Sequence, residues 1–362
     1  MDRQFYLNLA AAGLGMPIGA DVVLHDKADP ESVLLDGEQL GELIEETAAR
    51  YGTPLAFPRM DLELEKRALL EMLGVAPEDM PQYHFSTIPD AEVFERVKEH
   101  LLTSPLTPKM QAQADAIQHI AQNTTLLPIG MCIGPFSLMT KLVADPITPV
   151  CMAGMGISAS EDSEIRLVEQ VIELGLLVIT HNIERQIDAG AKAVFIAEPA
   201  ANKVYFSPNQ IESGSDIFVR YAMSYDRRIK DLLDARGVDL IFHCCGELID
   251  YMVRQFASLD PAILSLGSSR KLWEDAALVP KTTVLFGNLP SKQFYSDDLI
   301  TLPEVRRRAD ELIQKMREVG HPFILGTECD LLSVPGCQEA ISQKADAIAS
   351  SHCACACRTA AA

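Results

Sequence analysis

The stretch LIFHCCGELID, residues 240–250, places one histidine and two cysteines at the end of an apolar run. Imidazole nitrogen and thiolate sulfur are the ligands that zinc usually takes in proteins. Side chains alternate between the two faces of a strand, so His243 and Cys245 point the same way and Cys244 points the other way. The spacing therefore favours His243 and Cys245 as two ligands of one metal ion, with Cys244 as a bystander.

A third ligand has to come from another strand end, because two ligands do not fill a tetrahedral site. The stretch LGTECD, residues 325–330, ends a second apolar run and supplies Cys329. One histidine and two thiolates with an open fourth position are typical of a catalytic zinc site.

The alternative is a set of buried core residues, because cysteine is among the residue types most often found inside proteins. We favour this alternative for four other cysteines: Cys132, Cys151, Cys244 and Cys337.

Short apolar runs recur along the chain, and each is followed by a turn and then by a helical pattern. Seven runs are clear and an eighth, at residues 16–26, is weaker. The seven are residues 53–61, 126–136, 192–200, 238–246, 262–269, 282–290 and 322–330. Continuous apolar strands that alternate with helices are typical of parallel sheets, and this number of units predicts a (β/α)₈ barrel with an N-terminal extension.

The residues with chemical potential follow these runs, at the carboxyl ends of the predicted strands. In a (β/α)₈ barrel this end forms one rim, where active sites lie. A doubly wound open sheet is the structural alternative, but no G-x-G-x-x-G follows the first strand and no phosphate-binding loop sequence occurs. The helical segment at residues 302–320 repeats Val305, Ala309, Leu312 and Met316 on one face.

Three other segments carry specific expectations. Residues 76–110 are polar and rich in proline, which predicts an insertion before the second clear strand. Residues 152–162 form either a mobile flap or a linker ending in a helix cap at Ser160 or Asp162. We predict one barrel domain over residues 1–345 and a tail over residues 346–362, whose HCACAC sequence we interpret as oxidisable rather than as a specific metal site.

The net charge restricts the partners. Acidic residues outnumber basic ones by 51 to 31, and the formal charge is −20. Such a surface repels phosphate backbones, so we expect no nucleic-acid partner. The N-terminal residues lack the long apolar core of a secretory signal, and nine cysteines in 362 residues are too few for a disulfide scaffold. We therefore expect a cytoplasmic protein without a membrane partner.

Five stretches, in this order, resemble the uroporphyrinogen decarboxylase superfamily over roughly residues 50–345. They are GPFSLMTKLV, QIDAGAKAVFIAEPAANKVYFSPNQIE, HCCGELIDYM, FGNLP and GTECDLLSVPG. The resemblance implies a barrel. Within the superfamily, the chain resembles the cobamide-dependent methyltransferase branch, in which H-x-C and a distant cysteine bind zinc. The resemblance implies that His243, Cys245 and Cys329 do so here.

That resemblance implies a zinc-dependent methyltransferase in which zinc activates a thiol such as coenzyme M. The thiolate then takes the methyl group of a corrinoid, such as methylcobalamin, carried by a separate corrinoid protein. Other acceptors, such as tetrahydrofolate, and methoxylated or methylamine donors stay open. The alternatives are a metal-free decarboxylase, which normally needs clustered N-terminal arginines, and a non-catalytic corrinoid-binding barrel.

The carboxylate that fills the fourth zinc position in this branch has no counterpart in LSLGSSRKLWED, where the first acid is Glu274. Glu198, Glu328 or Asp330 is expected to substitute, unless water takes the position. We assign Glu198 and Asp330 as catalytic candidates, although Glu198 also suits a structural hydrogen-bonding role. Asp61 and Asn288 are weaker candidates for the site.

Overall fold

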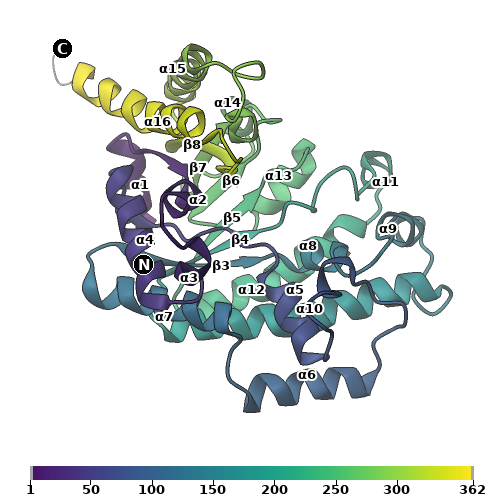
Figure 1. Cartoon of the computed structure of the whole chain (residues 1–362). Helices are drawn as coiled ribbons and strands as arrows, with labels where there is room; N and C mark the ends of the chain where they lie inside the picture. Colours follow the sequence, from purple (N-terminus) through teal and green to yellow (C-terminus); the bar gives the residue numbers. More distant parts are fainter. Residues whose placement is uncertain (1–2, 360–362) are drawn as a thin grey trace.

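Eight parallel strands form one curled sheet in the computed structural model, which describes residues 3–359 and, for side chains, residues 3–351 (Figure 1). The strands are β1 Gly15–Ile18, β2 Leu55–Ala56, β3 Leu127–Ile133, β4 Ala193–Ala197, β5 Asp239–Cys244, β6 Ile263–Leu266, β7 Val284–Leu289 and β8 Phe323–Asp330. Their order is β1-β8-β7-β6-β5-β4-β3-β2, so consecutive strands from β2 to β8 lie side by side and β1 pairs with β8. The predicted (β/α)₈ barrel is confirmed.

All eight predicted strands exist, and the weak eighth run is the one whose bounds differ most. Only its first residues belong to β1, and helix α2 begins at Ala20. The valines that follow are buried on α2, so their apolar character reflects a buried helix rather than a longer strand. A short apolar run does not by itself distinguish the two.

Helices connect and surround the strands (Figure 1). They are α1 Arg3–Ala11, α2 Ala20–His25, α3 Pro30–Val33, α4 Gly37–Arg50, α5 Leu64–Met72, α6 Ala91–Thr103, α7 Pro108–Asn123, α8 Pro135–Thr140, α9 Ile147–Gly154, α10 Ser163–Asp188, α11 Pro208–Glu212, α12 Ser224–Ala235, α13 Asp250–Ala257, α14 Leu272–Asp275, α15 Leu302–Val319 and α16 Gln338–Thr359. Short turns of other helix types are η1 Met80–Gln82, η2 Val219–Met223 and η3 Ser291–Gln293. No helix among residues 3–359 has the length and apolar character that crossing a bilayer requires.

Aromatic side chains fill the interior of the curled sheet. Phe57, which follows β2, packs edge-on against Phe195 of β4 with ring centroids 5.5 Å apart, and stacks on Phe286 of β7 at 6.1 Å. Strands far apart in the sheet order therefore meet across the interior. β1 and β2 end the strand order without pairing, but the Thr53 hydroxyl lies 3.2 Å from the Met16 sulfur across this gap.

The N-terminal extension forms α1, which packs at the amino ends of the strands. The Tyr6 hydroxyl donates a 2.9 Å hydrogen bond to Asp239, the first residue of β5. The Arg3 guanidinium binds the carbonyl and carboxylate of Asp260, just before β6. α1 therefore lies at the end of the barrel opposite the rim that carries the candidate site.

Two segments lie outside the repeating pattern. The predicted insertion at residues 76–110 contains η1 and α6, and α6 packs against α5 and α10 at the periphery (Figure 1). The backbone of the predicted tail is helical as far as Thr359, because α16 runs from Gln338 across position 345. The side chains of HCACAC lie outside the described residues, and the division at residue 345 stays a prediction.

Asp162 caps α10 and ends the linker that precedes it. Its carboxylate accepts hydrogen bonds from the backbone of Glu164 at 2.9 Å and Ile165 at 3.0 Å. We expect Asp162→Ala to lower the free energy of unfolding by about 1 kcal/mol, because two amide groups at the start of the helix lose their acceptor. Urea unfolding measures this. As a control, Asp298→Ala removes an exposed carboxylate that makes no hydrogen bond or ion pair within the described residues, and equal losses in the two variants would contradict the role of the cap.

Candidate metal centre

The end of β5 divides its side chains between the two faces of the sheet. His243 points into the barrel, where its ring stacks on Phe195 with centroids 5.3 Å apart. Cys244 points the other way, fully buried, with its sulfur 3.7 Å from the carbonyl oxygen of Ala201. β5 thus places His243 and Cys244 on opposite faces of the sheet, as the alternation of side chains along a strand predicts.

Cys329, near the end of β8, completes a group of three. Its sulfur, the Cys245 sulfur and a ring nitrogen of His243 all lie within 4.8 Å of one another. His243 is buried, whereas both cysteines are half-buried. No carboxylate among the described residues joins this group. The arrangement suits a metal ion with three protein ligands and one open position.

A hydrogen bond orients the His243 ring. Nδ1 lies 2.8 Å from the hydroxyl of Ser265, which is directly opposite on β6. Nε2 is buried and has no hydrogen-bond partner among the described residues. An unpartnered buried nitrogen is costly unless something binds it, and a metal-ligating histidine usually binds a second group through its other nitrogen. The three residues therefore fit a metal such as zinc.

The two thiols differ in their affinity for a proton. The pKa of Cys245 is lowered to about 3, first because the Cys329 thiol donates a hydrogen bond to it and then because His243 and Lys292 lie close, although burial acts in the opposite direction. The pKa of Cys329 is raised because it donates that hydrogen bond and because it is buried. The geometry thus favours a thiolate at Cys245, and a thiolate is the form that binds metals.

Two residues beside the site, Met60 and Lys292, were not predicted from the sequence. Met60, in the loop after β2, places its sulfur 4.0 Å from that of Cys329. Burial disfavours the charged form of Lys292 on η3, but Cys245, Cys329 and Glu328 outweigh this and raise the pKa of its ammonium group. Both residues lie within four positions after the observed ends of β2 and β7, although Met60 falls inside the run predicted at residues 53–61. This placement near a strand end was the signal that could have found them.

The uroporphyrinogen decarboxylase family model, "Uroporphyrinogen decarboxylase (URO-D)", matches residues 36–336. The chain belongs to the uroporphyrinogen decarboxylase family. Among solved structures it is similar to a methyltransferase from Methanosarcina mazei, with a TM-score of 0.63, 15% sequence identity and coverage of 97% of this chain and 98% of that one. At this identity the likeness shows a shared fold. No curated protein sequence matches the chain.

Membership of the uroporphyrinogen decarboxylase family raises the question of arginines that would bind a polycarboxylate substrate. The N-terminal quarter of the chain holds four arginines, of which two lie away from the rim or are already paired and a third is exposed on a helix. Arg3 is at the amino ends of the strands, Arg50 pairs with Asp346 on α16, and Arg67 is exposed on α5.

Arg59, the fourth, lies in the loop after β2 and is neutralised by two carboxylates. Its Nε is 2.6 Å from Asp21 and its Nη1 is 3.2 Å from Asp61. The candidate residue Asp61 is therefore held in this ion pair. The described residues at the rim supply no cluster of free arginines of the kind that a polycarboxylate needs.

The carboxylate of Glu198 lies outside the group of three ligands. Glu198 follows Ala197, which pairs with His243, so its side chain points to the other face of the sheet and is fully buried. It accepts hydrogen bonds from the backbone of Phe136 at 3.1 Å and Ser137 at 2.6 Å, at the first turn of α8. Burial raises its pKa to about 7, and these hydrogen bonds oppose that rise. The contacts are those of a structural cap.

Asp330, the other catalytic candidate, ends β8 beside Cys329. It is buried, and burial together with the neighbouring Asp21 carboxyl raises its pKa well above the ordinary value, while Arg59 opposes the rise. Glu328 is held by Ser268, which donates to it from both its backbone (3.1 Å) and its hydroxyl (2.6 Å).

The amide of Asn288 donates to the carbonyl oxygens of Gly267 at 2.7 Å and Arg270 at 2.8 Å, so it holds the loop after β6. None of these polar side chains joins His243, Cys245 and Cys329 as a fourth candidate metal ligand.

Proposed function

We propose that this protein is a zinc-dependent methyltransferase that moves a methyl group between a corrinoid protein and a small thiol. One observation carries the proposal: His243, Cys245 and Cys329 converge at the barrel rim, and the buried Nε2 of His243 has no hydrogen-bond partner among the described residues. The family and the methyltransferase of the same fold are in keeping with this function. Catalytic roles for Glu198 and Asp330 stay predictions.

The ligand set explains what the site would do. Zinc bound there would lower the pKa of a thiol at the open position and hold it as a thiolate. His243, fixed by Ser265, and the two cysteines would position that sulfur at the rim. In the transfer, a sulfur–carbon bond forms as the carbon–cobalt bond breaks, the bonding electron pair stays on the cobalt, and the thiol proton goes to solvent.

Free methylcobalamin tests this function without the partner protein. Zinc-loaded protein, methylcobalamin and coenzyme M or another small thiol are expected to yield the methyl thioether and cob(I)alamin under anaerobic conditions. Because a metal supplies several kcal/mol of stabilisation, removing zinc should slow the reaction by at least about 100-fold. Mass spectrometry of the thioether and the cobalamin spectrum measure it.

The same assay distinguishes the alternatives. Turnover that persists in zinc-free protein would contradict the role of the metal. Release of carbon dioxide from uroporphyrinogen would favour the metal-free decarboxylase. If methylcobalamin binds but its methyl group is transferred neither to any of the thiols nor to tetrahydrofolate, the non-catalytic barrel would be favoured.

A further inference from the structure

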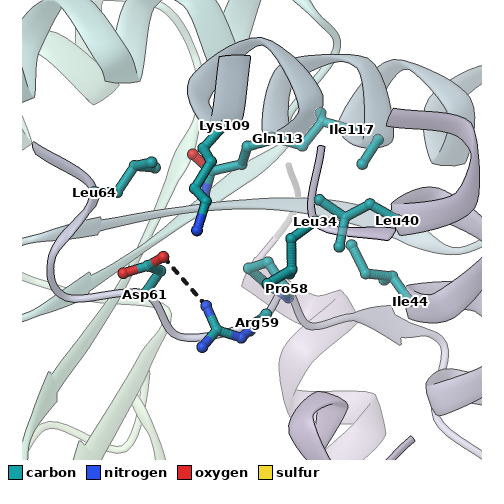
Figure 2. Close-up of a pocket in the computed structure, with 11 residues that line it drawn as sticks. Leu34, Leu40, Ile44, Pro58, Arg59, Asp61, Leu64, Lys109, Gln113 and Ile117 are labelled. Carbon is teal, nitrogen blue, oxygen red and sulfur yellow. Dashed lines mark hydrogen bonds and ion pairs between the residues drawn. The ribbon is translucent and has the colours of Figure 1, made fainter. Parts of the chain in front are cut away.

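A cavity lies between α4, α7 and the loop after β2, outside the group of metal ligands (Figure 2). The hollow, counted together with the part that is open to solvent, has a volume of about 480 Å³. Most of its walls are apolar, and the polar groups gather on one side. The apolar lining is Leu34, Leu40, Ile44, Pro58, Leu64, Ala116 and Ile117. Apolar walls with a few convergent polar groups are typical of small-molecule sites.

The helices that form the walls cannot close the cavity by moving together. α4 and α7 are already in close contact through two glycines of α4. A Cβ added at Gly37 would lie 2.2 Å from the Cβ of Asp115, and one added at Gly41 would lie 2.7 Å from the ring of His119. The backbones thus meet beside the cavity, and the space is a fixed feature of their packing.

Two polar groups of α7 have no partner within the described residues. Gln113 is 8% exposed, and its carboxamide oxygen is buried without a hydrogen bond, while its nitrogen donates to the Met131 carbonyl. Lys109, one turn earlier on the same face, makes no ion pair or hydrogen bond in the described part of the chain. Figure 2 shows both side chains at the cavity, with the Lys109 ammonium turned toward Arg59 and Asp61. An unpaired buried acceptor thus lies one turn from a free donor.

We infer that this cavity binds a slender apolar molecule with a hydroxyl head group. A hydroxyl donates its hydrogen to the Gln113 oxygen and accepts one from Lys109, so it satisfies both groups. A carboxylate has no hydrogen for Gln113 and would meet the Asp61 carboxylate, which pairs with Arg59 at 3.2 Å. The apolar body would pack between Leu40 and Ile117.

This site is distinct from the proposed transferase site, although one loop borders both. Met60 contacts Cys329, whereas its neighbours Arg59 and Asp61 line the cavity. Zinc content therefore serves as an independent check that variants of the cavity are folded and keep their metal centre.

The test compares 1-hexanol with hexanoate, two molecules of equal chain length that differ in the head group. Ligand-observed NMR titration of the full chain is expected to show saturable binding of 1-hexanol, about fivefold tighter than hexanoate, as one additional neutral hydrogen bond would give. Equal affinities or non-saturable binding of 1-hexanol would overturn the inference.

Two variants locate the binding. Ile117→Trp fills the apolar end and should abolish binding of 1-hexanol. Lys109→Met keeps most of the side-chain volume at a half-buried position and should weaken the binding of 1-hexanol about fivefold. Lys98→Met on α6 is the matched control and should bind 1-hexanol as the unmodified protein does, because it removes an exposed lysine whose one ion pair in the described part of the chain is with Glu95. Undiminished binding in Lys109→Met would overturn the inference even if Ile117→Trp does not fold.

Discussion

Protein with Cys245→Ala or Cys329→Ala is expected to retain almost no zinc, whereas the unmodified protein should hold about one zinc ion per chain. Each substitution leaves two ligands, and two ligands do not fill the tetrahedral coordination that zinc prefers. Metal analysis after purification without chelators measures this. Because both cysteines are only half-buried, these variants should fold, which circular dichroism checks.

Cys244→Ala provides the matched control. It removes a thiol from the adjacent position, but one that is fully buried on the other face of β5 beside Ala201. We expect this variant to keep its zinc and to lose some stability, because a buried side chain is truncated. Zinc lost only in Cys244→Ala, or absent from the unmodified protein, would contradict the ligand assignment.

Ser265→Ala should weaken zinc binding by about 10-fold to 100-fold, the usual effect of removing a residue that orients a metal ligand. The Ser265 hydroxyl is 2.8 Å from Nδ1 of His243 and holds the ring, which leaves Nε2 without a partner among the described residues and available to a metal ion. Without this hydrogen bond the His243 ring has to be fixed in position when zinc binds, and this lowers the affinity for zinc. Competition with a chromophoric chelator measures the dissociation constant.

Thr283→Val is the control for this prediction. Thr283 is as fully buried as Ser265, and its hydroxyl donates to the Pro261 carbonyl at 2.9 Å, at the amino end of the barrel. Both variants lose one buried hydrogen bond and should lose similar stability. Only Ser265→Ala should change zinc affinity, and an equal change in both would mean that the effect is structural.

Much of the fold could be predicted because its elements have strong local patterns. The eight apolar runs became strands, and Val305, Ala309, Leu312 and Met316 are all buried on α15. The bounds of β1 were wrong, because α2 follows after a single residue and is buried too. The helical backbone of the tail was also not expected, since alanine and cysteine repeats carry no amphipathic period.

The candidate site could be predicted in part. His243, Cys245 and Cys329 come together because strand alternation and the common rim both act on them. The surroundings of Glu198 could not be predicted, since they depend on the register between β4 and β5 and on the position of α8. Ser265 and Lys292 likewise reach the site through strand pairing and a loop conformation, which the sequence pattern does not encode locally.

The closed end of the barrel has a consequence for the kinetics of the proposed reaction. α1 covers the amino ends of the strands, and Phe57, Phe195 and Phe286 fill the interior beneath His243. Both reactants must therefore enter by the same mouth. A corrinoid is far wider than a small thiol and would cover that mouth once docked. In the proposed reaction the order of addition would then be compulsory, with the thiol first and the methylated corrinoid second, and excess corrinoid protein should inhibit by trapping an enzyme that has no acceptor.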